Sequence, residues 1–496
     1  MADFDLAIIG GGINGTAIAR DAAGRGLRVL LVEQNDLGAG TSSASSKLIH
    51  GGLRYLQYGA FRLVRESLKE REVLLRTAPH IIRPLRFLLP PAGGYVEAVR
   101  LRTGLFLYDH LGRRKLLPKT KTIDLTHHPV GQPLKRNFRY GFEYSDCWVD
   151  DARLVVLMAL DAKLRGADIR TRTRCVRAER HDEWHLVLSN HGRRETVTAR
   201  VMINAGGPWV AQVAENILRV PLRGGVRLVK GSHIVVKRTF NHDRAYTFFG
   251  DDGRVVFALP FARDFTLIGT TDQDFIGDVN APAPDANEIV YLCNAVNRYS
   301  RVTLGPDDVV WAFAGVRSLY DDGADRPEEV TRDYTLMLDE KFREGPLLTV
   351  YGGKITTARK LAEAALARIA HFFNMRPPWT SGMTLPGGNF RAEEFDQHVL
   401  RTRNRWEFLE PDDARRLFQA YGTRVELILG DAKSYDQLGP RLSGGLTGAE
   451  VTYLMKHEWA ESPEDVLWRR SKAGLVATAA DQDALARLMK APASAG

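Results

Sequence analysis

The chain has 496 residues, of which 44% are hydrophobic and 26% charged, and its formal net charge is +9. This is the composition of a globular protein, and the length suffices for two or three domains. Three cysteines without a Cys-x-x-Cys pair exclude a disulfide scaffold and a zinc–cysteine site, and no apolar run approaches the roughly 20 residues of a membrane-spanning helix.

The N-terminal segment has the pattern of a βαβ unit. Residues 4–9 form an apolar strand, a helix is expected from about 13 to 25, and residues 27–33 form the next strand. Because the first strand begins directly after Met-Ala-Asp, we expect no secretory signal. Together with the cysteine usage, this favours a reducing, cytoplasmic setting.

The turn after the first strand carries a Gly-x-Gly-x-x-Gly pattern at Gly10, Gly12 and Gly15. Gly10 permits the tight turn, Gly12 lets a pyrophosphate approach the helix N-terminus, and Gly15 lets helix and strand pack closely. Glu33 ends the second strand, where it can accept hydrogen bonds from a ribose hydroxyl. The pattern and its context therefore predict a dinucleotide site.

Positive charge is concentrated in residues 51–140, which hold 18 Lys and Arg against 6 Asp and Glu, a net +12. A helix is expected over 60–78, and in residues 81–117 arginines are interleaved with Leu, Phe, Ile and Tyr. Such a basic region suits anionic lipid, nucleic acid or a phosphorylated substrate, and an ordinary solvated surface is the alternative. The apolar side chains of residues 81–117 favour a surface that enters lipid headgroups, with an ordinary lobe of the core with basic edges as the alternative.

Strands dominate the middle of the chain. Residues 168–204 are predicted to form short strands, and residues 222–275 are predicted to form an antiparallel sheet that serves as a substrate lobe.

Two further strands run into glycines. The strand that ends at residue 204 is followed by Ala205 and Gly206, and the strand 347–351 is followed by Gly353 and a helix start at Thr356. Their backbone N–H groups could contact the same dinucleotide, the second set at its flavin end. A second Gly-x-Gly-x-x-Gly, usual in flavoproteins that react with NAD(P), is absent. We therefore predict bound FAD and a small-molecule electron donor.

After about residue 385 the pattern changes to short helices. Asp412 begins one helix and Gly422 ends it, Thr447 and Glu450 have capping-box spacing, and Pro463 is at a first helical position.

The predicted fold is α/β, with a Rossmann-like FAD-binding domain, an antiparallel-sheet substrate domain and an α-helical C-terminal domain. The first two interleave in residues 1–385, with the substrate and membrane lobe mainly in 75–145 and 210–345, and the helical domain covers 386–496.

Longer motifs occur in order at 41–56 (TSSASSKLIHGGLRYL), 141–152, 230–236, 268–272, 315–317, 331–335, 351–354 and 465–470. Together they resemble the FAD-dependent, aerobic glycerol-3-phosphate dehydrogenases, within the D-amino-acid-oxidase-like flavoproteins. The resemblance implies oxidation of sn-glycerol 3-phosphate to dihydroxyacetone phosphate by hydride transfer to FAD. It also implies electron transfer to a membrane quinone by an enzyme bound peripherally to the inner face of the cell membrane.

The matched motifs imply roles for particular residues. Arginine has a planar fork that suits phosphate oxygens, so Arg54, Arg317 and Arg332 are the candidate phosphate ligands. Tyr55 and Thr270 are candidate hydroxyl partners of the substrate.

The catalytic candidates are His233, Arg317 and Lys354, with His233 as the base and Lys354 as a positive charge near flavin and substrate oxygen. His50 is the alternative base, although its loop is expected under the cofactor. The motif at 41–56 implies additional cofactor contacts from Thr41, Ser42, His50, Gly51 and Gly52.

Several alternatives stay open. The electron acceptor could be oxygen, as in a glycerol-3-phosphate oxidase, or the substrate could be that of another D-amino-acid-oxidase-type enzyme. A nucleic-acid-binding flavoprotein is disfavoured because no basic groove with stacking aromatics is recognisable. A catalytically inactive interaction protein is disfavoured by the complete set of site residues. The C-terminal domain could form homodimer contacts or bind a partner protein.

Overall fold

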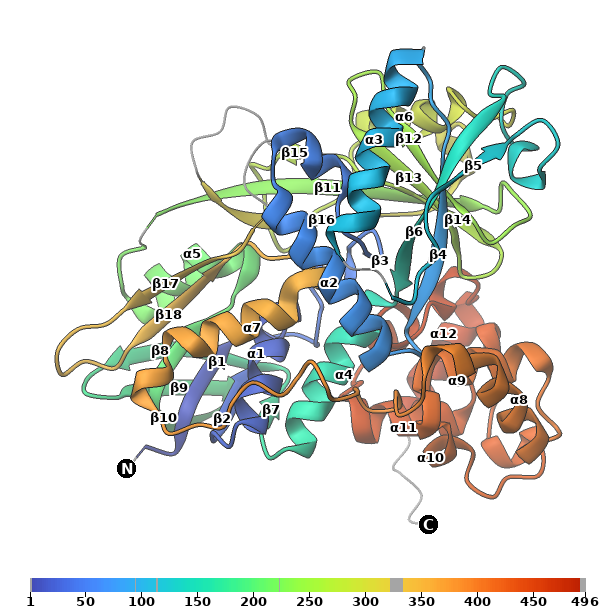
Figure 1. Ribbon diagram of the computed structural model, residues 1–496. Coiled ribbons are helices and arrows are strands. Elements are labelled where there is room, and N and C mark those ends of the chain that lie inside the picture. Colours follow the sequence, from blue (N-terminus) through green and yellow to red (C-terminus); the bar gives the residue numbers. More distant parts are fainter. Residues whose placement is uncertain (1, 94, 113–114, 223, 322–332, 491–496) are drawn as a thin grey trace.

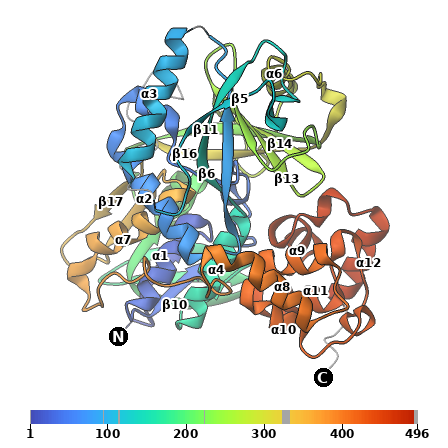
Figure 2. The same ribbon diagram turned by 45° about the vertical axis from the view of Figure 1, so that its right-hand side comes forward.

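A computed structural model describes residues 2–93, 95–112, 115–222, 224–321 and 333–490. The molecule has one sheet flanked by helices, a second sheet beside it, and a group of C-terminal helices next to the first sheet (Figures 1 and 2). The predicted Arg332 lies outside the described residues.

The first sheet is built around the predicted βαβ unit. Its described strands are β1 (Phe4–Ile9), β2 (Val29–Val32), β7 (Asp168–Arg170), β8 (Thr173–Arg180), β9 (Trp184–Asn190), β10 (Arg193–Asn204), β17 (Thr335–Asp339) and β18 (Leu347–Tyr351). The order is β17-β18-β10-β1-β2-β7, parallel from β18 to β7, and the ribbon β8–β9 continues antiparallel from β10. The parallel strands end at one edge, which is where such sheets bind nucleotides.

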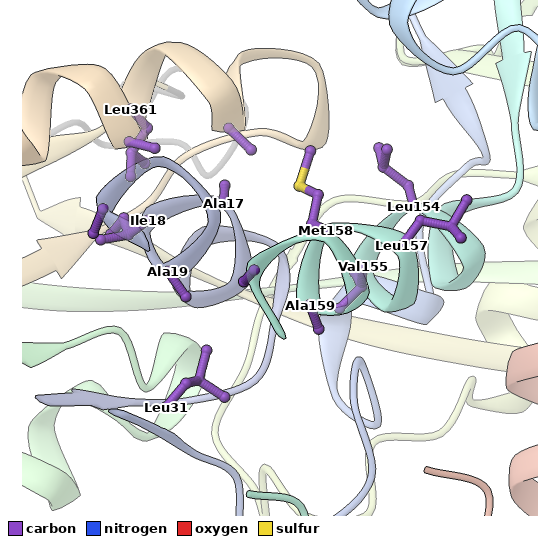
Figure 3. Close-up of a cluster of buried hydrophobic side chains, with 14 of the residues drawn as sticks. Ala17, Ile18, Ala19, Leu31, Leu154, Val155, Leu157, Met158, Ala159 and Leu361 are labelled. Carbon is purple, nitrogen blue, oxygen red and sulfur yellow. The ribbon is translucent and has the colours of Figure 1, made fainter. Parts of the chain in front are cut away.

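Helices α1 (Ile13–Gly24), α4 (Asp151–Leu164) and α7 (Ala358–Arg368) cover one face of this sheet. Figure 3 shows Ala17 of α1 between side chains of α4 and α7, including Met158 and Leu361. The small residues of α1 let the neighbouring helices pack closely, and each fully buried Leu or Met contributes roughly 1.5–3 kcal/mol to stability. This core fixes α1, whose N-terminus faces the dinucleotide site.

The second sheet is largely antiparallel. Its described strands are β3 (Leu48–Ile49), β4 (Ile82–Leu89), β5 (Lys121–Asp124), β6 (Tyr140–Val149), β11 (Gly225–Lys237), β12 (Ala245–Phe249), β13 (Val255–Phe261), β14 (Phe265–Gly269), β15 (Gln273–Asp274) and β16 (Val309–Asp321). Among these, the pair β12–β4 is parallel, and the other pairs are antiparallel. Helices α2 (Phe61–Thr77), α3 (Tyr95–Leu111) and α6 (Ala286–Asn297) pack on this part of the molecule.

The stretch 81–117, interpreted above as one lipid-contacting surface, divides into two different elements. β4 is an internal strand between β6 and β12, and its Phe87, Leu88 and Leu89 are fully buried. Helix α3, by contrast, leaves Tyr95 82% and Phe106 61% exposed. Apolar residues in the first half of the stretch therefore serve the core, and only α3 retains the expected apolar surface.

The C-terminal segment is helical, with its own core around Trp406, Phe418 and Leu454. Its α-helices are α8 (Phe395–Arg405), α9 (Pro411–Tyr421), α10 (Glu426–Leu429), α11 (Gly448–Glu458) and α12 (Ala479–Lys490), and a π-helical turn spans Asp465–Arg470. Across the described part of the chain, no helix combines the length and apolarity needed to cross a membrane.

Candidate active site

A cavity of about 410 Å³ opens at the carboxyl edge of the first sheet. Eight of the residues predicted for the dinucleotide line it, namely Gly10, Gly12, Glu33, Thr41, Ser42, Ala205, Gly206 and Gly353. These residues come from the ends of β1, β2, β10 and β18 and from the loop after β2, which are far apart in sequence. The parallel register of the sheet brings them to one edge.

Two glycines of the N-terminal turn are required by its geometry. Gly10 has φ +115°, and a Cβ there would lie 2.5 Å from the carbonyl oxygen of Ala205. A Cβ on Gly15 would lie 1.9 Å from the carbonyl oxygen of Gly10, so any larger residue at this position would keep α1 from packing closely against β1. Gly15 does not line the cavity, and it therefore shapes the site from behind.

Glu33 lines the cavity and ties its wall to the glycine turn. Its carboxylate accepts hydrogen bonds from the backbone N–H of Gly11 at 2.7 Å and of Asn35 at 2.8 Å. Burial raises the pKa of Glu33, and these two N–H groups oppose that rise. A hydroxyl-rich ligand such as a ribose would supply further donors to the same carboxylate.

Asn14, on the first turn of α1, was not selected from the sequence. Its Nδ2 donates to the carbonyl oxygen of Gly352 at 3.1 Å, whereas its buried Oδ1 has no hydrogen-bond partner among the described residues. Asn14 lines the cavity, so a bound hydroxyl would satisfy this acceptor. The polar cavity edge therefore fits FAD.

A second chamber of about 270 Å³ adjoins the first. The two cavities share Ile13, Thr41, Ser42, Arg317, Leu319 and Gly353, so they form one continuous space. Most of the other predicted residues line this chamber, namely His50, Gly52, Arg54, Tyr55, Thr270, Lys354 and Thr356.

Gly51 lies between His50 and Gly52 but, unlike them, does not line the chamber. Its N–H donates to the Tyr108 hydroxyl at 2.7 Å, and a Cβ there would lie 2.5 Å from Leu68. Gly51 therefore allows the loop to pack against α2 and α3.

Three cations, Arg54, Arg317 and Lys354, line the second chamber, and the two arginines flank one carboxylate, Asp272. Arg317 Nη1 donates to Asp272 Oδ1 at 2.6 Å, and Arg54 Nη1 lies 3.8 Å from Oδ2. With Lys354, the four side chains carry a net charge of +2. This excess suits a dianionic phosphate better than a single carboxylate.

Asp272 belongs to the motif at 268–272 but was not predicted as a site residue. A carboxylate is an unexpected neighbour of a phosphate site, and nothing local in the sequence marks its contact with Arg54. Gly231 of β11 was also not predicted as a site residue. A Cβ there would lie 2.7 Å from Arg317 Nη2 and 2.7 Å from Thr270 Oγ1, so only glycine leaves room for both.

The ammonium group of Lys354 lies over the face of the Tyr55 ring. The Lys354 Nζ is 3.6 Å from the centroid of the Tyr55 ring, which is the geometry of a cation–π interaction. The ring therefore holds the ammonium group in the chamber without neutralising its charge.

The two candidate bases occupy different positions. His50 lines the chamber, whereas His233 is 1% exposed and does not line it. His233 Nε2 is 2.9 Å from Ser46 Oγ, and Ser46 does line the chamber. Phe313 stacks on the His233 ring with the centroids 5.0 Å apart. His233 therefore reaches the chamber only through a serine that the sequence did not single out.

Both histidines are neutral at pH 7. Burial, assisted by Lys354, Arg71 and Arg317, lowers the pKa of His50 to about 3. Burial, assisted by Lys47 and Arg317, also lowers the pKa of His233 to about 3. Such a weakly basic imidazole can accept a proton only from a group that is itself strongly acidic at that moment.

The loop that carries Thr41, Ser42 and Ser46 is held by a buried ion pair. Lys47 Nζ is 2.9 Å from both carboxylate oxygens of Asp151, and both side chains are fully buried. This pair fixes the loop between the two sheets. It was not predicted, because its two residues lie in separate motifs.

The fold and the two connected cavities define an FAD-dependent oxidoreductase. A family model described as FAD dependent oxidoreductase matches residues 5–359, and one described as the C-terminal domain of alpha-glycerophosphate oxidase matches residues 378–494.

A glycerol-3-phosphate dehydrogenase of Pseudomonas aeruginosa is 49% identical over 490 residues, covering 98% of this chain and 95% of the relative. A D-erythritol 1-phosphate dehydrogenase of Brucella abortus is 47% identical over 484 residues, covering 97% and 96%. The structure of a Bacillus halodurans glycerol-3-phosphate dehydrogenase complexed with FAD has a TM-score of 0.74 and 25% identity, covering 98% of this chain and 94% of that one.

The chain belongs to the glycerol-3-phosphate dehydrogenase family of D-amino-acid-oxidase-like flavoproteins. The predicted family, fold class and FAD cofactor are confirmed.

Proposed function

We propose that the protein oxidises sn-glycerol 3-phosphate to dihydroxyacetone phosphate. The observation that carries the proposal is the group of Arg54, Arg317 and Lys354 in the chamber next to the FAD cavity, with Asp272 as their counter-ion. A dianionic phosphate is the anion that this group fits. The 49% identical relative named glycerol-3-phosphate dehydrogenase supports the same substrate.

FAD, when bound, supplies the hydride acceptor. Arg54 and Arg317 bind the phosphate, with Arg332 proposed as a third ligand from outside the described residues, and Tyr55 and Thr270 contact the substrate. Lys354 stabilises negative charge that develops on the C2 oxygen. Binding of the phosphate fixes the position of the reacting carbon. Most of the reduction in the activation barrier therefore comes from orientation and electrostatics.

The proton of the C2 hydroxyl passes to His233 through Ser46. The Ser46 hydroxyl lines the chamber and is within hydrogen-bond distance of His233 Nε2, which supports a two-step relay. His50 is the alternative acceptor, because its ring reaches the chamber directly.

A second candidate substrate is D-erythritol 1-phosphate. The relative from Brucella abortus with that name is 47% identical over nearly the whole chain, almost the same identity as the glycerol-3-phosphate dehydrogenase. Both substrates present the same phosphate to the arginines and differ by one CHOH group at the other end. Glycerol 3-phosphate is preferred because the motif resemblance points to it.

The test is anaerobic mixing of the purified flavoprotein with each phosphate in turn, followed by the flavin absorbance near roughly 450 nm. Rapid bleaching by sn-glycerol 3-phosphate, with glycerol and D-amino acids inactive, is the expected result. Faster bleaching by D-erythritol 1-phosphate would transfer the assignment to the longer polyol phosphate. A flavin that neither phosphate bleaches would contradict the proposal.

A membrane quinone is the proposed electron acceptor, with oxygen as the alternative. Support comes from α3, where Leu101 lines the chamber while Tyr95, Val96, Val99 and Phe106 are exposed on the other side. The exposed Arg100 and Arg102 lie on the same helix. Apolar side chains beside basic ones suit peripheral attachment to anionic lipid, here at the inner face of the cell membrane. α3 projects away from the C-terminal helices in both views (Figures 1 and 2).

A further inference from the structure

The loop that follows β2 forms one wall of the FAD cavity. Its residues Glu33, Gln34, Asn35, Gly38, Ala39 and Gly40 all line that space. The loop is also tied to the glycine turn, because the N–H of Gly38 donates to the Gly11 carbonyl oxygen at 3.0 Å and the N–H of Gly11 donates to Glu33. A displacement of this loop therefore changes the shape of the cofactor site.

Asp36, in the middle of this loop, does not line the cavity but is fully buried on its other side. Its carboxylate accepts from Arg470 Nη1 at 2.6 Å and Nη2 at 2.7 Å, and from Arg469 Nε at 2.6 Å. Both arginines belong to the π-helical turn Asp465–Arg470 of the C-terminal domain. The loop of the FAD site is thus bound by charges that come from the other end of the chain.

The same turn is linked to the loop at a second point, through Arg172. Arg172 donates its backbone N–H to the Asn35 carbonyl oxygen at 3.0 Å, and its Nη2 donates to the two carboxylate oxygens of Asp465 at 2.7 and 2.8 Å. Arg470 in turn is anchored within its own domain, since its Nε donates to the Glu458 carbonyl oxygen at 3.0 Å. The turn is therefore held rigidly where it meets the loop. In Figure 1 the C-terminal helices, orange to red, lie beside α4 and the first sheet.

We propose that the turn Asp465–Arg470 is a positioning element for FAD, so that the C-terminal domain acts as a clamp on the cofactor site. Without Arg470, the buried Asp36 carboxylate would lose two of its three hydrogen bonds and one of its two cationic partners and keep only Arg469, which is unfavourable. The loop would then shift to bring Asp36 to water, and Glu33 and residues 38–40 would leave their places in the cavity wall. This role goes beyond the proposed substrate chemistry and does not depend on it.

The test measures the dissociation constant of FAD from the apoprotein, by quenching of flavin fluorescence, in Arg470→Met. A matched control is Arg416→Met, because Arg416 makes a bidentate pair with buried Glu450, at 2.8 Å twice, inside the same domain and away from the loop. Both variants should lower the melting temperature of the apoprotein. We expect Arg470→Met to weaken FAD binding by about tenfold or more and Arg416→Met by less than about twofold.

A second pair of variants keeps the test decisive if Arg470→Met does not fold. Arg470→Lys retains a cation but loses the bidentate fork, and should weaken FAD binding by about threefold or more. Asp36→Asn combined with Arg470→Met removes the carboxylate charge that has lost its main partner, and should recover part of the lost affinity. The proposal is overturned if Arg470→Met or Arg470→Lys binds FAD as tightly as the unaltered protein, or if Arg416→Met weakens FAD to the same degree. Glycerol 3-phosphate is not needed for any of these measurements, so their outcome is separate from that of the substrate assignment.

Discussion

Arg317 and Asp272 form an ion pair inside the second chamber, with 2.6 Å between Arg317 Nη1 and Asp272 Oδ1. The same carboxylate lies 3.8 Å from Arg54 Nη1. One acidic side chain thus fixes the relative position of two cations that come from different parts of the chain. It also lowers the positive charge that an incoming phosphate meets.

Asp272→Asn should make inorganic phosphate a stronger competitive inhibitor. A unit charge about 6 Å from another contributes about 3 kcal/mol at an effective dielectric constant of about 20, and a dianion gains more than that. The looser arginine positions cost about 1–3 kcal/mol, so the charge effect is larger. We expect the inhibition constant for phosphate to fall by about tenfold. An unchanged or increased inhibition constant would show that Asp272 acts mainly by holding the arginines in place.

Lys354→Met should slow the reduction of the flavin by substrate about 100-fold, because one charged group that stabilises the reacting oxygen is lost. Stopped-flow absorbance under anaerobic conditions measures this rate. Lys354→Arg keeps the positive charge over Tyr55 and should recover part of the rate. A Lys354→Met rate within about threefold of the unaltered protein would exclude this role.

The proposed proton relay predicts that substitutions of Ser46 and His233 have non-additive effects on the rate of flavin reduction. Ser46→Ala and His233→Asn should each lower the rate of flavin reduction about 100-fold, and the double variant should be no slower than the slower single one. His50→Asn is the comparison. If His50→Asn alone causes the large loss while Ser46→Ala remains within about threefold, His50 is the proton acceptor instead.

The exposed face of α3 predicts lipid binding. Replacing Tyr95, Val96 and Phe106 together by Ser should weaken binding to anionic vesicles, measured by co-sedimentation, by at least about 100-fold, since each fully buried apolar side chain contributes roughly 1.5–3 kcal/mol. The rate of anaerobic flavin reduction should not change. Leu400→Ser with Leu427→Ser is the control, because these side chains are 56% and 58% exposed in the C-terminal domain. Equal vesicle binding by both variants would rule out α3 as the lipid contact.

His80 should make the protein less stable in acid. It is 1% exposed, and neither ring nitrogen has a hydrogen-bond partner within the described residues. Burial, with Arg153 nearby, lowers its pKa from 6.5 to about 3. Between these two values the unfolded chain binds a proton that the folded chain does not, so stability falls as pH falls, by up to about 1.4 kcal/mol per pH unit.

The measurement for His80 compares melting temperatures at pH 7 and pH 5. His80→Leu should lose less of its melting temperature over this interval than the unaltered protein does, by a few degrees. The exposed His181 provides the control, and His181→Gln should leave the pH dependence unchanged. An identical loss in the His80 variant would mean that the fold does not lower the pKa of this histidine.

The local patterns of the sequence were sufficient to predict the glycine turn and the acidic residue at the edge of the first cavity. Gly10, Gly12, Gly15 and Glu33 lie within one βαβ unit, where the spacing of strand, turn and helix follows from neighbouring residues alone. The C-terminal helices were predictable for the same reason. The helix predicted to begin at Asp412 begins one residue earlier, at Pro411, and Gly422 ends it. The Thr447 hydroxyl accepts from the N–H of Glu450 at 3.3 Å at the start of α11.

Only the tertiary structure decided which side chains face the substrate chamber. His233 is behind Ser46 rather than in the chamber, and β4 is a core strand although its composition suggested a surface. Asp272 meets Arg54, and Asp36 meets Arg470, across long intervals of sequence. Such contacts depend on strand register and on the packing of one domain against another, which no short pattern encodes. The sequence by itself therefore determined the cofactor and the family, whereas the fold determined the electrostatic balance of the site and the clamp on its wall.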